Sequence, residues 1–185
     1  MARTIRHVLL TGRPGCGKTT VVRRVIEQLG RLRLAGFYTR EVRQDGGRVG
    51  FEAVGLGGGC AMLAHRDFAS RLRVGRYGVQ LEAFDRLIRS ELDRPPGDAD
   101  LFIVDEIGKM ECCGDVFLHA VRRLLDGPVP ILATVASRGA GLIAEVKARP
   151  DAELLVVSAE NRDRLPGELA GRFRRRSERS QKSHG

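Results

Sequence analysis

The sequence predicts an α/β protein of three layers, in which helices cover both faces of a mostly parallel sheet with an inserted β-hairpin. Short apolar runs alternate along the chain with longer amphipathic stretches, which is typical of α/β folds. Two of these runs, at 7–10 and 101–104, suit strands that are covered on both faces. Asp45-Gly46 stands between two extended segments and favours a hairpin, because the backbone of such a turn requires positive φ.

The elements follow in chain order. His7–Leu10 is expected as a buried strand, and a helix over 17–29 comes next, since its apolar residues recur at the spacing of one buried face. The other expected strands lie at 36–42, 49–54, 101–104, 129–135 and 154–157. Further helices are expected at 81–92, 115–125 and 142–148, with a short one from about Asn161. We assign no regular structure to 55–73, where Gly57-Gly58-Gly59 predicts a flexible loop.

Length and composition indicate one soluble domain. The 185 residues suffice for a single core, and 42% hydrophobic with 30% charged residues is a globular composition. We predict one domain over 1–171. No run of eighteen apolar residues occurs, and the first ten residues leave no room for a signal peptide. We therefore expect a cytoplasmic protein without a membrane partner, and a monomer.

Much of the net charge of +9 lies at the end of the chain. The segment after Gly171 holds six Arg or Lys residues against Glu178 alone, which accounts for +5. Such a polar, basic segment predicts a disordered tail over 172–185. A solvated tail is the favoured interpretation, and contact with RNA or an acidic partner is the alternative.

The four cysteines do not form a metal-binding pattern. No C-x-x-C occurs and no histidine stands at ligand spacing, so we expect reduced thiols and no zinc site. One of them lies in the glycine-rich loop described next, and its oxidation is a hypothetical route to inhibition of binding. The cysteines are Cys16, Cys60, Cys112 and Cys113.

A phosphate-binding loop follows the first predicted strand. Residues 12–19, GRPGCGKT, match the pattern G-x-x-x-x-G-K-[ST] and open a predicted helix. Glycines let successive N–H groups point at phosphate oxygens, and the helix N-terminus favours negative charge. Lys18 is expected to reach the β- and γ-phosphates, and the Thr19 hydroxyl to ligate Mg²⁺. The candidate nucleotide-binding residues here are Gly12, Arg13, Pro14, Gly15, Cys16, Gly17, Lys18, Thr19 and Thr20.

A second acidic group is expected at the end of a neighbouring strand. Asp105 and Glu106 directly follow the apolar run 101–104. With Thr19, Asp105 is the candidate metal-holding residue, and Glu106 is the candidate for orienting or deprotonating the attacking water. Lys109 is a candidate for stabilising charge on the transferred phosphoryl group, as an arginine finger does. Glu111 is expected to orient Lys109 or its loop. The candidate catalytic residues are Glu106, Lys18 and Lys109.

Taken together, these motifs resemble a known family. GRPGCGKTT at 12–20, GFYTREV at 36–42, RVGFE at 48–52 and VDEIGKME at 104–111 are similar, in this order, to the small nucleoside triphosphatases described from hyperthermophiles. The animal member of that family is called cancer-related nucleoside triphosphatase. The similarity extends over roughly 5–170. Two segments depart from it, Cys112-Cys113 and 57–71.

The resemblance implies a RecA-like P-loop NTPase fold and slow hydrolysis of ATP, GTP and other nucleoside triphosphates to diphosphate and phosphate. It also implies two nucleotide-binding stretches. The first is 12–19, and the second comprises Leu101, Phe102, Ile103, Val104, Asp105, Glu106, Ile107 and Gly108.

Two other functions remain open at this point. A nucleotide or nucleoside kinase would need a lid with arginines and an acceptor pocket, and the arginines after Gly171 are terminal rather than inserted between strands. A nucleotide-gated switch, acting at RNA through the basic tail, would hydrolyse slowly until a partner stimulates it. Base recognition is weakly marked: Asn161 and Arg162 either approach the base or ribose, or Asn161 caps a helix, which we favour. We therefore expect broad base specificity.

Overall fold

The computed structural model describes residues 5–95 and 97–182, with side chains up to Arg179. Its strands are β1 (His7–Thr11), β2 (Leu34–Gln44), β3 (Gly47–Gly55), β4 (Cys60–His65), β5 (Arg73–Val74), β6 (Tyr77–Val79), β7 (Leu101–Ile107), β8 (Ile131–Val135) and β9 (Ala152–Val156). Its helices are α1 (Lys18–Gln28), α2 (Glu82–Leu92), α3 (Asp115–Asp126), α4 (Leu142–Lys147) and α5 (Leu165–Lys182), with a 3-10 turn at Glu111–Cys113.

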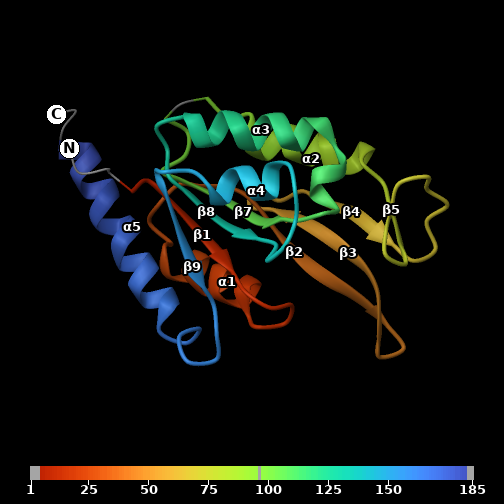
Figure 1. Ribbon diagram of the computed structural model, residues 1–185. Helices are drawn as coiled ribbons and strands as arrows, with labels where there is room; N and C mark the ends of the chain where they lie inside the picture. The colour runs from red at the N-terminus through yellow and green to blue at the C-terminus, as the bar shows by residue number, and fades with distance from the viewer. Residues whose placement is uncertain (1–4, 96, 183–185) are drawn as a thin grey trace.

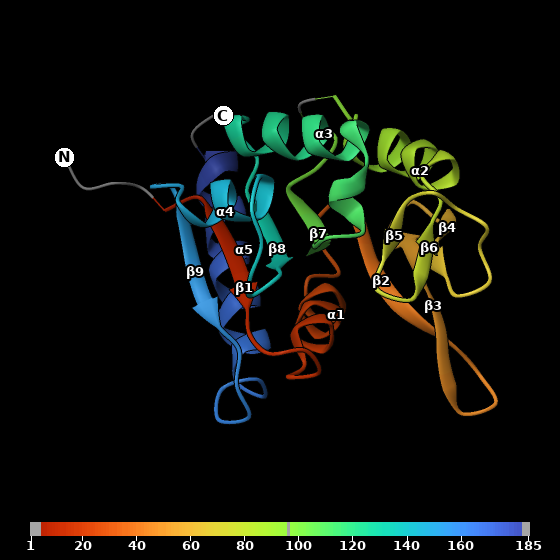
Figure 2. The same ribbon diagram turned by 45° about the vertical axis from the view of Figure 1, so that its right-hand side comes forward.

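One sheet runs through the described part of the chain in the order β5-β6-β4-β3-β2-β7-β8-β1-β9. The strands from β2 to β9 in this order pair in parallel, whereas β3, β4, β6 and β5 continue the sheet in antiparallel fashion. Helices α2, α3 and α4 cover one face, and α1 and α5 cover the other (Figures 1 and 2). The predicted three-layer α/β class is confirmed.

The predicted hairpin is present between β2 and β3. Asp45 and Gly46 both have positive φ, +50° and +75°, as an Asp-Gly turn of this kind requires. The hairpin projects away from the parallel part of the sheet (Figure 2). Since β2 pairs with β7 on one side and β3 on the other, the hairpin is anchored directly beside the strand that carries Asp105.

The segment from 55 to 73 is more regular than expected. Leu63 and Ala64 of β4 are fully buried and pack in the core beneath α2, so β4 extends the hairpin by a strand. The side chain of Glu91, on α2, explains why a glycine is needed at position 57. Glu91 Oε1 accepts a hydrogen bond from the Gly57 N–H at 2.9 Å, and a Cβ at Gly57 would lie 2.6 Å from that oxygen. The glycine-rich segment is therefore a tight, ordered turn.

The end of the chain is also structured. The prediction of a disordered tail is wrong for residues 172–182, because α5 continues to Lys182, whereas residues 183–185 lie outside the described residues. Leu165, Leu169 and Phe173 recur every four residues and pack against the α1 side of the core, with Phe173 only 3% exposed. Arg176 Nη1 donates to the carbonyl oxygens of Ile5 and Arg6, each at 3.2 Å. These contacts hold the basic segment against the rest of the protein as part of a helix.

Candidate active site

The loop between β1 and α1 has the conformation that its glycines predict. Gly12, Gly15 and Gly17 have φ values of +153°, +76° and +105°, and a residue with a Cβ would be strained there. A Cβ at Gly12 would also lie 2.7 Å from the carbonyl oxygen of Val157. The loop is thus seated tightly against the chain after β9. The backbone N–H groups of the loop and the start of α1 are the candidate anion-binding groups.

The buried carboxylate of Asp105 joins this loop to β7. Asp105 is fully buried, and its Oδ1 accepts hydrogen bonds from the hydroxyls of Thr19 (3.2 Å) and Thr134 (2.6 Å). Its Oδ2 accepts a bond from the Thr39 N–H at 3.3 Å. Burial raises the pKa of Asp105, while these three bonds and the charge of Lys18 oppose that shift. The structure therefore brings the two candidate metal-holding residues together.

Glu106 lies beside the same loop and faces a cavity. Burial raises the pKa of Glu106, Lys18 lowers it, and the neighbouring Asp105 raises it further. Lys18 Nζ lies 3.4 Å from the carbonyl oxygen of Gly12, so its ammonium stays within the loop. A carboxylate and an ammonium thus stand at one end of the phosphate loop, next to Asp105.

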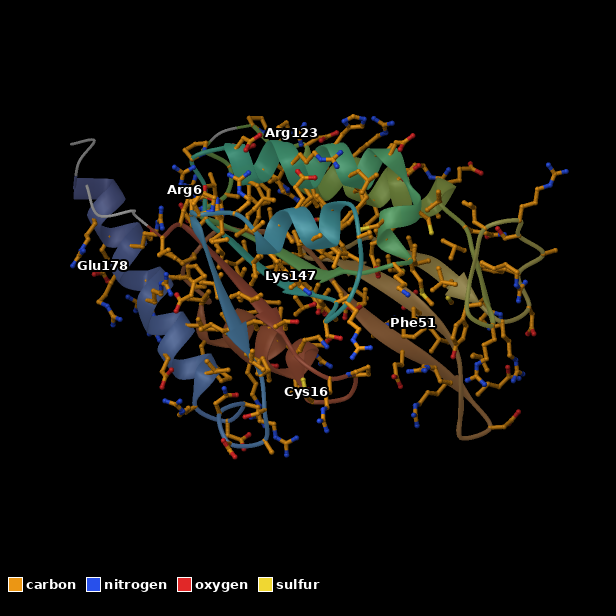
Figure 3. The ribbon with its side chains drawn as sticks, in the orientation of Figure 1. Arg6, Cys16, Phe51, Arg123, Lys147 and Glu178 are labelled. Atoms are coloured by element: carbon orange, nitrogen blue, oxygen red, sulfur yellow. The ribbon has the colours of Figure 1, made fainter. Side chains whose placement is uncertain are left out.

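The cavity has a volume of about 740 Å³. One half is lined by the phosphate loop, the start of α1 and the end of β7, including Lys18, Thr19 and Glu106. The other half is lined by the β2–β3 hairpin and neighbouring segments, including Arg48 and Phe51. Figure 3 labels Cys16 in the phosphate loop and Phe51 on β3.

Of the two roles expected for Glu111, orienting Lys109 or orienting its loop, the contacts of Glu111 favour the second. Lys109 is exposed and lines the cavity, whereas Glu111 is buried, and no ion pair joins the two in the described structure. Glu111 Oε2 lies against the loop instead, 2.7 Å from where a Cβ at Gly108 would stand. Burial, with smaller contributions from Glu106 and Asp105, raises the pKa of Glu111 to about 8. Glu111 is therefore placed to orient the loop, and Lys109 is free to turn toward the cavity.

Some predicted binding residues do not reach the cavity. Leu101, Phe102, Ile103 and Val104 are 0–4% exposed and belong to the two cores, and Ile107 is fully buried. Within the second predicted stretch, Glu106 and Gly108 line the cavity, and Asp105 lies beneath it. The apolar part of the stretch positions these residues rather than contacting a ligand in this cavity.

Sequence reasoning missed two partners of Asp105 and misplaced one asparagine. Thr134 is the polar residue of an otherwise apolar strand, a signal that was available in the sequence, whereas the contact of the Thr39 backbone has no sequence signal.

The Asn161 side chain accepts a hydrogen bond from the Ser158 N–H at 2.9 Å and donates one to the Val156 carbonyl at 2.8 Å. It thus closes the turn after β9, and the expectation that it caps a helix is wrong. Arg162 lies beside Gly17, with its Cδ 3.5 Å from where a Cβ would stand.

The protein has a P-loop NTPase fold, with a phosphate loop after β1 and an acidic residue at the end of β7. The chain belongs to the NTPase family, whose model matches residues 7–170. The predicted resemblance is therefore confirmed. The described residues contain no helix long and apolar enough to cross a membrane.

Relatives are similar over most of their length. The chain is 36% identical to nucleoside-triphosphatase THEP1 of Thermotoga sp. (strain RQ2), over 88% of this chain and 92% of the relative. It is 37% identical to the cancer-related nucleoside-triphosphatase homolog of Mus musculus, over 86% and 92%. Among solved structures, it matches the crystal structure of THEP1 from the hyperthermophile Aquifex aeolicus with a TM-score of 0.81 and 35% identity, over 88% of this chain and 96% of that one.

Proposed function

We propose that the protein hydrolyses nucleoside 5′-triphosphates, ATP and GTP among them, to nucleoside diphosphate and phosphate with the help of Mg²⁺. The observation that carries this proposal is the 3.2 Å contact between the Thr19 hydroxyl and the Asp105 carboxylate, with Glu106 beside it in an open cavity. The names of the relatives, nucleoside-triphosphatases, agree with it.

The residues around Asp105 suit a magnesium ion. Their donor atoms are a carboxylate and a hydroxyl, and hard oxygen ligands are those that Mg²⁺ prefers. Thr19 and Asp105 would hold the ion, Asp105 through bound water. When bound, the ion neutralises charge on the β- and γ-phosphates. Thr134 keeps the carboxylate oriented for this task.

The chain's own groups then have separate roles. Backbone N–H groups of the loop and Lys18 hold the phosphates in place. Glu106 is the candidate for orienting the attacking water and accepting its proton, because it is a partly exposed carboxylate facing the cavity. Lys109 is the candidate for stabilising negative charge on the γ-phosphoryl oxygens, since it is an exposed cation on the cavity wall.

Broad base specificity follows from where the polar contacts lie. The groups identified here address phosphate and metal. Both polar atoms of the Asn161 side chain form hydrogen bonds with the backbone of the turn after β9, so we assign this amide to the turn rather than to base recognition. A monomeric state and a cytoplasmic location stay predictions from the sequence.

The test is a phosphate-release assay with ATP, GTP, CTP and UTP, each with and without Mg²⁺. We expect release from all four, with kcat/KM values within about tenfold of one another, and loss of release when Mg²⁺ is chelated. Lys18→Ala is expected to raise KM strongly because it removes the ammonium from the phosphate loop. Release from a single nucleotide, or undiminished release without divalent ions, would contradict the proposal.

A further inference from the structure

The hairpin half of the cavity lies on the side of the phosphate loop that carries Asp105 and Glu106. Tyr38 of β2 pairs with Asp105 of β7, and the next residue, Thr39, donates its N–H to the Asp105 carboxylate. The continuation of β2 therefore begins directly beside the metal-holding and water-orienting residues. The turn after β9, which brings Arg162 to Gly17, lies on the far side of β1 in the sheet order. One side of the phosphate loop thus faces the β2–β3 hairpin, and the other side faces the turn after β9.

Cations line this half of the cavity. Arg23 of α1 and Arg40 and Arg48 of the hairpin contribute to its wall, together with the carboxylates Glu41, Glu106 and Glu111. Arg40 is paired with Glu52, and Arg48 with Glu41. A phosphate loop and Lys18 already supply the contacts that a triphosphate needs. The arginines come in addition to these contacts and indicate a second anionic group on the hairpin side, because guanidinium groups bind phosphate through paired hydrogen bonds.

The guanidinium groups are held in position by their neighbours. Arg23 stacks over the Tyr38 ring at 5.6 Å, and Arg48 stacks over the Phe51 ring at 5.0 Å. Arg48 Nε donates to the Tyr77 hydroxyl at 3.0 Å, and its Nη1 donates to Glu41 at 2.8 Å. Fixed guanidinium groups lose little conformational freedom on binding, which favours recognition of an anion at this position.

Apolar side chains complete the same half. Phe51, Val74 and Met110 are partly buried and line the wall next to these arginines. A cavity that combines cations with an aromatic ring and aliphatic groups suits an organic phosphate with a flat, weakly polar body. A second phosphate ion alone would leave this apolar surface in contact with water.

We propose that the hairpin half of the cavity binds a nucleoside monophosphate, which accepts the γ-phosphoryl group in place of water. An oxygen of the monophosphate forms a bond to the γ-phosphorus while the bond from that phosphorus to the β,γ-bridging oxygen breaks. The products are two nucleoside diphosphates, and a dianionic acceptor has no proton to release. Arg23 and Arg48 bind the phosphate of the monophosphate and hold it next to the γ-phosphate. The proposal rests on the proposed function, since both reactions use the same triphosphate and the same phosphate loop.

The test uses the full chain with Mg²⁺ and ATP labelled at the γ-phosphate, in the presence of AMP, GMP, CMP or UMP. We expect labelled nucleoside diphosphate to form with at least one monophosphate while release of labelled phosphate falls. Lys18→Ala protein purified in parallel should abolish the transfer, which excludes a contaminating kinase. If no phosphate is released in the absence of any monophosphate, it is the proposed hydrolysis that fails.

Variants locate the acceptor site. Arg23→Ala and Arg48→Gln should each raise the KM for the monophosphate about tenfold or more, with the KM for ATP changed by less than about twofold. Arg43→Ala is the matched control: Arg43 lies on the same hairpin, is exposed and pairs with Glu41, and should keep the KM of the unchanged protein. Circular dichroism checks that each variant is folded. The proposal is overturned if no monophosphate yields labelled diphosphate, if a monophosphate binds without accepting the phosphoryl group, or if the transfer is insensitive to both Arg23 and Arg48.

Discussion

Thr134 donates its hydroxyl to Asp105 Oδ1 across 2.6 Å, from the strand adjacent to β7. This bond fixes a carboxylate that is fully buried and that also receives the Thr19 hydroxyl. A group that orients a metal-holding residue contributes to metal affinity without contacting the metal.

Thr134→Val removes this bond while keeping the shape of the side chain. We expect the apparent affinity for Mg²⁺ to fall about tenfold or more, because the carboxylate loses its strongest orienting contact. The measurement is the Mg²⁺ dependence of phosphate release. Thr11→Val on the neighbouring strand is the control, since Thr11 Oγ1 is buried without a hydrogen-bond partner in the described structure, and its loss should leave Mg²⁺ affinity unchanged. Equal effects of the two variants would show that Thr134 has no orienting role.

Glu106→Gln tests the residue assigned to the attacking water. Glutamine keeps the size of the side chain but cannot accept the proton, so kcat should fall about 100-fold or more while nucleotide binding changes by less than about threefold. Single-turnover release and binding of a fluorescent ATP analogue separate the two quantities. Normal turnover in this variant would remove Glu106 from the mechanism.

Lys109→Ala tests the cation on the cavity wall. If Lys109 acts on the γ-phosphoryl group during transfer, kcat should fall about tenfold or more with KM little changed, and Lys109→Arg should restore part of the loss. Steady-state kinetics with ATP measure both parameters. A rise in KM at constant kcat would instead indicate that Lys109 only helps to bind the nucleotide.

Phe173→Ala tests the packing of α5. Phe173 is almost fully buried beside Leu169, and large-to-small changes of this kind cost about 3–5 kcal/mol in the free energy of unfolding. Urea denaturation of this variant should show the loss, and Arg175→Ala, an exposed residue on the same helix, should stay within about 0.5 kcal/mol. Equal stability of both variants would mean that residues 172–182 do not pack as described.

His7→Gln tests a buried histidine. His7 is fully buried, its Nε2 lies 3.1 Å from the Leu125 carbonyl, and burial lowers its pKa from 6.5 to about 4. Between these two pH values the unfolded chain binds a proton that the folded chain does not. Stability should therefore be lost as the pH falls from 6.5 to 4, by up to about 3 kcal/mol.

The check is the free energy of unfolding measured at several pH values for the unchanged protein and for His7→Gln. Glu111 has the opposite effect, because its raised pKa makes the folded chain retain a proton and lowers stability as the pH rises toward 8. The difference between the two proteins isolates His7. Parallel curves for them below pH 6.5 would show that folding does not lower the pKa of His7.

The site was predictable where chemistry demands particular residues at particular spacings. A glycine-rich loop before a helix and two carboxylates at the end of an apolar strand have few other uses, and the fold brings Thr19 and Asp105 together as their motifs implied. The contribution of the Thr39 backbone was not predictable, because every residue except proline has an N–H group. The same holds for the hairpin half of the cavity, because its arginines and Phe51 come from separate segments.

Two predictions about the fold were wrong because local composition pointed away from the structure that forms. Six basic residues after Gly171 dominate the appearance of that segment, although the spacing of Leu165, Leu169 and Phe173 carries a helical signal. Glycines at 57–59 predict a flexible loop, but the packing of Glu91 against Gly57 requires them in an ordered turn. In both places tertiary contacts override what local composition favours.

Strand β2 belongs to both halves of the sheet, parallel to β7 on one side and antiparallel to β3 on the other. Asp105 pairs with the part of β2 that lies beside β7, whereas Arg40 of β2 and Arg48 of β3 lie farther along the hairpin, toward its tip. Substitutions or insertions toward the tip of the hairpin would therefore leave the phosphate chemistry undisturbed. The hairpin is therefore the place to engineer new selectivity without altering the phosphate loop.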